Sequence, residues 1–127
     1  MQLAGTQLTA SPIVIPPLAD GEIWVGVVSV GAALHHVILL PGDFEGPHAA
    51  MMAKAAELGG DLPTRVESAL LFAEAKAEFK PDYYWTKEQH ASDESYAWVQ
   101  DFTGGSQYCL HKDNVYPARA VRRVPIQ

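Results

Sequence analysis

At 127 residues, with 48% hydrophobic and 19% charged side chains, the chain has the length and composition of one globular domain. Its net charge of −6 is uneven: residues 1–110 carry 5 basic and 14 acidic side chains, and residues 111–127 carry 4 basic and 1 acidic. Because binding to a phosphate backbone needs a broad basic surface, this acidic body argues against nucleic acid as a partner.

Cysteine use and hydropathy bear on the compartment. Cys109 is the only cysteine, so the fold does not depend on a disulfide or on an oxidising compartment. No apolar run reaches the ~18 residues of a membrane span, and the N-terminus lacks the basic start of a signal peptide. We therefore expect no membrane insertion, and we expect a chain made in a cytoplasm that either stays there or leaves on a larger particle.

The first 20 residues are broken by prolines. Pro12 and the pair Pro16-Pro17 flank Ile13-Val14-Ile15, and prolines exclude a central strand. We expect an extended arm over residues 1–20 and a single domain over residues 21–127. The arm either packs on its own domain or docks on a neighbouring subunit, because apolar side chains in a tail need a surface to cover them.

Two strands and a helix are predicted next. Residues 22–30 form an almost continuous apolar run, which is typical of a strand covered on both faces. The small residues 31–33 allow a hairpin turn into a second strand over residues 34–40. Residues 47–58 are rich in alanine and methionine and predict a short helix that ends at Gly59-Gly60, where a left-handed cap is needed.

A second helix follows at once. Thr64 is its predicted N-cap and Glu67 completes a capping box, and we expect the helix to end within a residue or two of Phe79. Four apolar residues at helical spacing predict the face that packs on the core. These are Val66, Leu70, Ala73 and Ala77, and Phe72 and Phe79 widen the stripe.

After Pro81 the pattern has the period of a strand. Tyr96, Trp98, Gln100 and Phe102 share one face of a predicted strand. Turns at Gly104-Gly105 and Asp113-Asn114 lead into strands at 106–111 and 118–124. The order is a β-hairpin, two helices and an antiparallel meander, an α+β fold. Trp85 and Trp98 are expected to be interior pillars of its core.

Four segments in succession resemble the C-terminal domain of the Legionella collagen-like adhesin, over residues 60–124. They are Asp61-Leu62-Pro63-Thr64-Arg65-Val66-Glu67, Tyr84-Trp85-Thr86, Ala97-Trp98 to Phe102 with Gly104-Gly105, and Arg119-Ala120-Val121-Arg122. This family, otherwise of unknown function, is common in bacterial surface proteins and prophage-encoded chains. The resemblance implies a C-type-lectin-like fold, in which two helices flank a small twisted sheet and a loop-rich upper sheet carries the ligand.

The chain also departs from relatives within that broad fold. The calcium-lectin signatures Glu-Pro-Asn and Trp-Asn-Asp are absent, and so are the usual disulfides. Calcium-dependent sugar binding is therefore not implied. The paired cysteines of the related formylglycine-generating enzymes are missing too, and that chemistry with them.

No complete catalytic or metal-binding set is evident in the sequence. Cys109 and His111 suggest a nucleophile and a base, but no third group is evident to orient them. The histidines lack the spacing of metal ligands, and the Asp and Asn clusters match turns better than a calcium loop. We predict no catalytic residue, no metal and no cofactor.

The basic residues near the C-terminus allow two interpretations. Arg119 and Arg122 lie three apart on the predicted last strand and face opposite sides. One of them is then a partly buried fork that holds carboxylates or loop carbonyls. Alternatively, Arg122 and Arg123 form a patch for an anionic ligand.

The predicted functional surface is the polar loop from Thr86 to Ser95, which lies between the two tryptophans. Its adaptable side chains beside tyrosines are typical of binding loops on rigid scaffolds, and the alternative is a solvated connection. The candidate ligand-binding residues are Tyr84, Lys87, His90, Asp93, Tyr96 and Arg122.

These observations predict a non-enzymatic binding module, encoded by a phage or prophage and made in the host cytoplasm. It would bind a protein or glycan through the loop and assemble into an oligomer or onto a virion through residues 1–20. A second hypothesis is an accessory protein or inhibitor whose acidic body covers a basic host protein. An enzyme ranks third.

Overall fold

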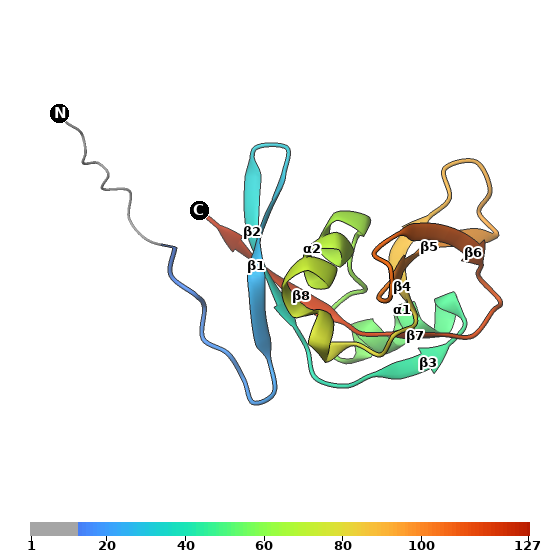
Figure 1. Ribbon diagram of the computed structural model, residues 1–127. Helices are drawn as coiled ribbons and strands as arrows, with labels where there is room; N and C mark the ends of the chain where they lie inside the picture. The colour runs from blue at the N-terminus through green and yellow to red at the C-terminus, as the bar shows by residue number, and fades with distance from the viewer. Residues whose placement is uncertain (1–12) are drawn as a thin grey trace.

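The computed structural model describes residues 13–127, so residues 1–12 of the predicted arm lie outside it. The elements are β1 (Ile23–Val30), β2 (Ala33–Leu39), β3 (Phe44–Gly46), α1 (His48–Glu57), α2 (Arg65–Ala75), the 3-10 turn η2 (Lys76–Glu78), β4 (Tyr83–Gln89), β5 (Tyr96–Asp101), β6 (Gln107–His111), β7 (Tyr116–Ala118) and β8 (Val121–Ile126). The predicted α+β order of a hairpin, two helices and antiparallel sheets is confirmed (Figure 1).

The N-terminal hairpin and the C-terminal strand make one antiparallel sheet in the order β1-β2-β8. Leu34 lies opposite Ile126 and Leu39 opposite Val121, so the two ends of the domain meet in this sheet. The central strand β2 is the one that is buried on both faces. For β1, which was predicted to be covered on both faces, this holds only in part: Val25 and Gly26 are buried, but Ser29 and Val30 at the hairpin end are exposed.

The C-terminal half forms a second antiparallel sheet in the order β4-β5-β6, and β3 pairs with β7 beside it. The predicted meander at 96–102 and 106–111 is confirmed, whereas the short β3–β7 pair was not predicted. The predicted last strand at 118–124 is interrupted at Arg119 and Ala120, where the chain leaves β7, which pairs with β3, and enters β8, which pairs with β2. A strand of only three residues is too short to show a recognisable hydrophobic pattern in the sequence.

The helix ends follow local chemistry. Thr64 Oγ1 accepts a hydrogen bond from the Glu67 amide at 3.1 Å, and Glu67 Oε1 accepts one from the Thr64 amide at 2.8 Å, so the predicted capping box is confirmed. After α1, Gly59 adopts a φ of 82° and the Gly60 amide donates to the Ala55 carbonyl, as a left-handed cap requires.

The predicted core-facing stripe of α2 is only partly correct: Leu70, Phe72 and Phe79 pack against the core, but the other members do not. Val66 is 64% exposed, and Ala73 and Ala77 are exposed as well. The buried side chains are instead Glu67, Ser68 and Leu71. A stripe chosen by apolarity cannot find them, because two of the three are polar and are buried only where long-range partners satisfy them.

The helices cover opposite faces of the β4–β5–β6 sheet, and side chains alternate between these faces. Trp85, Ala97 and Val99 pack with α1, whereas Tyr84 and Phe102 pack with α2 and the first sheet. Trp85 is fully buried, as predicted, and its Nε1 donates to the Gly46 carbonyl at 2.9 Å. One large aromatic side chain buries ~150–250 Å², so Trp85 anchors this core.

Candidate functional site

The face of the β4–β5–β6 sheet that carries Tyr84, Trp98 and Gln100, called here the α2 side, is only partly covered by α2. Trp98 on this face is half-buried. The guanidinium of Arg65, the first residue of α2, lies over its indole, 3.5 Å from the ring centroid. The prediction that Trp98 is an interior pillar is therefore wrong. Its ring forms part of a surface and is stacked under a cation.

Amide groups fix Arg65 in this position. Arg65 Nε donates to Gln107 Oε1 at 2.9 Å, and Gln107 Nε2 donates to the Arg65 carbonyl at 2.8 Å and to Gln100 Oε1 at 2.9 Å. The Arg65 amide also donates to Glu88 Oε2 at 2.7 Å. These contacts fix the Arg65 guanidinium, the Glu88 carboxylate and the side-chain amides of Gln100 and Gln107 at defined places on the sheet.

A depression of about 400 Å³ opens beside this network. Polar groups of both signs line it together with the apolar start of α2, so it presents hydrogen-bond donors and acceptors around a small apolar floor. Its lining residues are Arg65, Val66, Ala69, Glu88, Gln100, Gly105 and Gln107.

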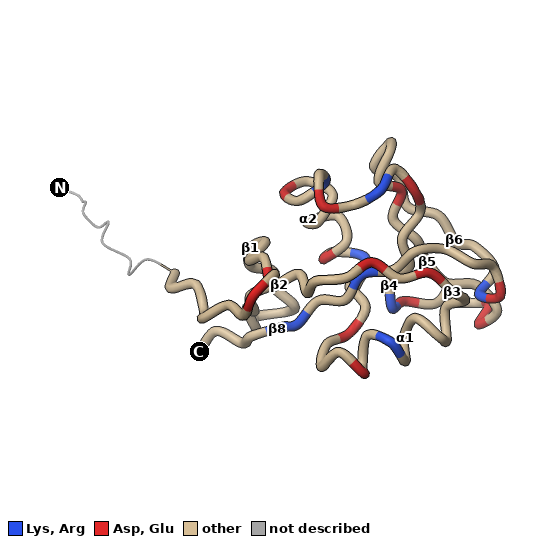
Figure 2. The backbone as a smooth tube through the Cα atoms, turned by 90° about the horizontal axis from the view of Figure 1, so that it is seen from below, with Lys and Arg blue, Asp and Glu red and all other residues tan. Residues whose placement is uncertain are grey.

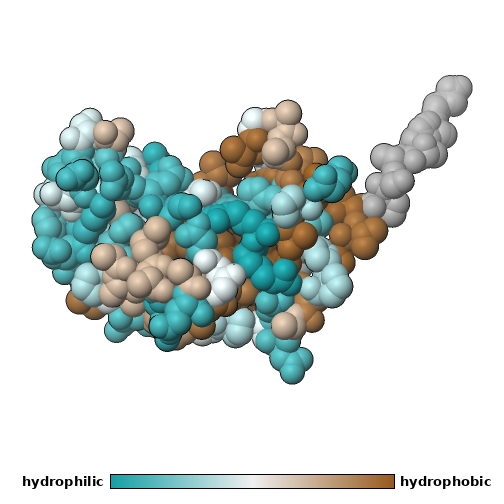
Figure 3. Space-filling model, turned by 180° about the vertical axis from the view of Figure 1, so that it is seen from behind, coloured by the Kyte–Doolittle hydropathy of each residue, from teal (hydrophilic) through white to brown (hydrophobic). Residues whose placement is uncertain are grey.

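A second depression, of about 280 Å³, lies on the same side and is lined by His90, Asp93, Tyr96 and Cys109. The rows Tyr96–His111, Trp98–Cys109 and Gln100–Gln107 follow one another along β5 and β6, so Trp98 lies between the two depressions. Figure 3, which views the molecule from behind, shows that this end of the molecule is largely hydrophilic.

The predicted loop is shorter than expected, because β4 continues to Gln89. The remaining loop is ordered by His90, whose Nδ1 accepts hydrogen bonds from the amides of Ser92 at 3.0 Å and Asp93 at 3.2 Å. A neutral imidazole that accepts at Nδ1 carries its proton at Nε2 and offers that N–H as a donor. The Asp93 carboxylate in turn accepts from the Ser95 amide at 3.0 Å.

Cys109 and His111, the candidate nucleophile and base of the sequence analysis, both lie on this side. Burial raises the pKa of the Cys109 thiol, which keeps it in the less nucleophilic form. The His111 ring packs edge-on against the Tyr96 ring, and the two ring centroids are 5.4 Å apart. Between residues 13 and 127, no group of three His, Cys, Asp or Glu side chains is placed to hold a metal ion.

The structure brings together three of the six predicted ligand-binding residues, His90, Asp93 and Tyr96. Tyr84 is only 2% exposed, and its hydroxyl donates to Asp43 at 2.6 Å; burial raises its pKa. A side chain in that position is part of the core and is closed to a ligand, so its place among surface residues is corrected.

The other two predicted residues are in ion pairs. Lys87 Nζ lies 2.7 Å from Asp61 Oδ2, and Arg122 holds Glu22 through contacts of 2.8 and 3.0 Å. Arg122 lies on β8 in the first sheet, away from the β4–β5–β6 sheet that carries the loop.

Sequence reasoning missed Arg65, Gln107 and Glu88. The turn at Gly104-Gly105 implies the register that places Gln100 opposite Gln107, so this amide pair had a usable signal. Arg65 had none, because its position over Trp98 depends on how α2 packs on the sheet.

The basic C-terminal segment is paired with the acidic body. Arg119 is buried and donates to the carbonyls of Glu78 at 2.6 Å and Leu40 at 2.9 Å, which confirms the prediction of one arginine that holds loop carbonyls. Arg123 grips Glu67 with two contacts of 2.7 Å. In Figure 2 basic residues of β8 lie among acidic ones. With Arg122 and Arg123 in such pairs, the alternative of an anionic-ligand patch loses its support.

Glu67, which is fully buried, is the centre of an ionic cluster with Arg123, His35 and Asp61, whose side chains are 15–26% exposed. Burial opposes ionisation of Glu67 most strongly, but hydrogen bonds from Arg123, the Thr64 amide and His35 together outweigh it and hold the pKa of this carboxyl below its usual value. The pKa of Asp61 is lowered in the same way, with hydrogen bonds outweighing burial. The cluster ties β2, α2 and β8 together.

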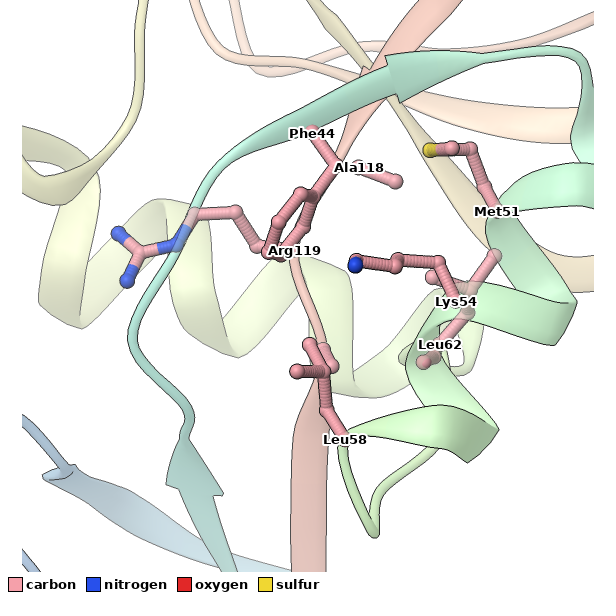
Figure 4. Close-up of a pocket in the computed structure, with 9 residues that line it drawn as sticks. Phe44, Met51, Lys54, Leu58, Leu62, Ala118 and Arg119 are labelled. Carbon is pink, nitrogen blue, oxygen red and sulfur yellow. The ribbon is translucent and has the colours of Figure 1, made fainter.

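The side chains between α1, β3 and β7 are closely packed. Figure 4 shows Met51 and Lys54 from α1 facing Phe44 and Ala118, while the Arg119 side chain points away. The space between them does not admit a water molecule. Lys54 Nζ lies 4.8 Å from the centroid of the Phe44 ring, which closes the opening with a cation–π contact.

Within the described chain, no helix has the length and apolarity that a membrane crossing needs. No protein-family model matches the chain, and no curated protein resembles it at a significant level. The resemblance to the Legionella adhesin domain therefore stays a prediction.

Proposed function

We propose that this protein is a non-enzymatic recognition module that binds a protein or glycan ligand on the α2 side of the β4–β5–β6 sheet. The observation that supports this is the pair of depressions, about 400 and 280 Å³, on either side of Trp98. Ligand sites are typically concave and combine an apolar floor with a few fixed polar groups.

The chemistry of the two depressions favours a ligand rich in hydroxyl or amide groups. Such a ligand needs donors and acceptors together, and this surface offers a guanidinium, two amides, carboxylates and an imidazole N–H. The groups are carried by strands and by a short ordered loop, so little conformational entropy is lost when a ligand binds.

The proposal includes a C-type-lectin-like fold. Pairing of β2 with β8 joins the two ends of the domain in one sheet, and α2 lies between this sheet and the separate β4–β5–β6 sheet, whose other face α1 covers. That arrangement is consistent with the one that the resemblance implies, in which the second sheet carries the ligand. Phage or prophage origin, with the module attached to a virion, belongs to the same proposal.

The test uses two tyrosines of similar exposure on opposite faces of the sheet. Tyr96 is 37% exposed on the α2 side, and Tyr108 is 44% exposed on the other face. The full chain, Tyr96→Ala and Tyr108→Ala are screened against a glycan array and against extracts of bacterial cell surface. We expect a ligand that Tyr96→Ala loses and Tyr108→Ala keeps. Equal loss in both variants, or no ligand at all, contradicts the proposal.

A second function is favoured by the loop at the same end of the molecule. Asp93 and Glu94 are exposed, and neither forms an ion pair within residues 13–127. An inhibitor or accessory protein that covers a basic host protein would use such charges, and its binding would weaken steeply with salt. Capture from host lysate that is unchanged between low and high salt would exclude this function.

A further inference from the structure

The outer edge of β1 has no partner in the described chain. In the order β1-β2-β8, strand β1 is hydrogen-bonded to β2 alone. Its remaining backbone N–H and C=O groups point away from the sheet, where they can pair with a further strand. The hairpin that carries this edge projects past α2 in Figure 1, so another chain can reach it.

This edge lacks most of the features that prevent strands from pairing between molecules. The eight residues of β1 include no charged side chain and no proline. One protective feature is present, an irregularity between Trp24 and Gly26 where the register with β2 shifts. The stretch from Gly26 to Val30 is regular and is therefore the part that can pair.

The sequence of β1 also suits pairing with itself. Across a two-fold axis, residues of one strand face the same set of residues on the other, so a charged strand would bring like charges together. A strand of valines, glycine and serine meets no such repulsion. The nearest charge, Glu22, is already held by Arg122 at 2.8 Å.

Exposed apolar side chains also occur on the arm and at the hairpin tip, and brown surface is visible at this end of the molecule in Figure 3. Six of them are 42–79% exposed: Ile13, Val14, Ile15, Leu18, Val30 and Leu34. At roughly 60–120 Å² for each fully exposed aliphatic side chain, they offer on the order of 300 Å² per copy. Two copies would bury about half of the ~1,200 Å² at the low end of stable interfaces, so the association is expected to be weak.

We propose that the partner of this edge is a second copy of the chain, with β1 paired antiparallel to its mate across a two-fold axis. The two three-stranded sheets then form one continuous sheet of six strands. Val30, at the tip of the hairpin, lies beside the new pair of strands. The α2 side of the other sheet stays open in each copy, so the dimer presents two ligand sites.

The test measures the mass of the full chain by sedimentation velocity from about 1 to 300 μM, a range that brackets weak interfaces. The double variant Ser29→Lys/Val30→Lys places positive charges on both sides of the axis at exposed positions. We expect the natural chain to pass from monomer to dimer within this range, and the double variant to raise the Kd at least ~10-fold. Val115→Lys, at 61% exposure between β6 and β7, is the matched control and should dimerise as the natural chain does.

Hydrogen exchange supplies a second measurement that does not depend on a variant. The amides of residues 26–30 that face the free edge should exchange more slowly as the concentration rises, while those of the loop at 90–95 should not change. A chain that is monomeric throughout the range overturns the proposal. So does a dimer that survives the double variant and is lost in Val14→Lys, because the arm would then be the interface.

Discussion

Replacing Glu67 by glutamine tests whether the ionic cluster around this buried carboxylate stabilises the fold. Glu67 is fully buried and accepts four hydrogen bonds of 2.7–2.8 Å, two from Arg123, one from His35 and one from the Thr64 amide. Glutamine keeps the shape and can still accept at one oxygen, so the capping box survives. Its side-chain NH2 group, however, is a donor. It takes the place of the carboxylate oxygen that accepts from His35 and Arg123, so donors then face a donor.

The expected loss follows from these contacts. Removing one partner of a buried ion pair costs ~3–5 kcal/mol. Because Arg123 keeps Asp61 at 2.7 Å and the Leu62 carbonyl at 3.1 Å, we expect the low end, about 3 kcal/mol. With an unfolding entropy near 2.1 cal/mol/K per residue, this lowers Tm by roughly 11 °C.

The assay is thermal unfolding at neutral pH, followed by circular dichroism, with Glu57→Gln as the control. Glu57 pairs with Lys54 on the surface at 3.1 Å and is 71% exposed, so its loss should cost less than ~0.5 kcal/mol, or about 2 °C. A decrease in Tm for Glu67→Gln that is no larger than that of Glu57→Gln would refute the reasoning.

Three further predictions concern stability. A carboxyl whose pKa is lowered by folding stabilises the fold above its unfolded pKa and loses that contribution as the pH falls through its folded pKa. Unfolding experiments at a series of pH values should therefore show stability falling below about pH 4.5, and the fall should be shallower for Glu67→Gln. An equal slope in the two proteins would contradict this. Tyr84→Phe should cost about 1–3 kcal/mol in urea unfolding, because the hydroxyl donates to a carboxylate and accepts from a backbone amide, whereas the control Tyr83→Phe should cost little; equal costs would contradict this. Gly60→Ala should cost about 1–3 kcal/mol because its Cβ would lie 2.5 Å from a carbonyl oxygen of β8, and more than Gly59→Ala, which meets no atom but keeps a positive φ.

Features that depend on neighbours in the sequence were predicted well. The Thr64–Glu67 capping box, the Gly59 cap and the first hairpin each involve residues within a few positions of one another. Such contacts form with few alternatives, so composition and spacing identify them. The complete burial of Trp85 was also predictable, because a large ring in a strand has few places to go except the core.

Features that depend on distant partners were not predictable. Glu67 was placed in its cap, but its burial depends on His35 and Arg123, which lie 32 and 56 residues away in the sequence. The same long-range contacts explain why Val66, Ala73 and Ala77 were wrongly expected in the core. A single sequence contains no signal for them.

The candidate site was partly predictable for the same reason. The loop residues His90, Asp93 and Tyr96 were expected together because they are close in sequence, and they line one depression. The other depression combines Arg65 with residues 23 to 42 positions later, so its existence follows from packing alone. Trp98 was misplaced because a tryptophan stacked under an arginine has the same sequence pattern as a buried one.

The most direct test of a ligand site on the α2 side follows the three indole N–H signals of the full chain by NMR. The titrant is the strongest glycan or surface protein from the binding screen. Trp98 lies between the two depressions, whereas the Trp85 indole is bonded to the Gly46 carbonyl and the Trp24 indole to His36. We predict that the Trp98 signal shifts and the other two stay in place. A shift of the Trp24 signal with Trp98 unchanged would contradict the account.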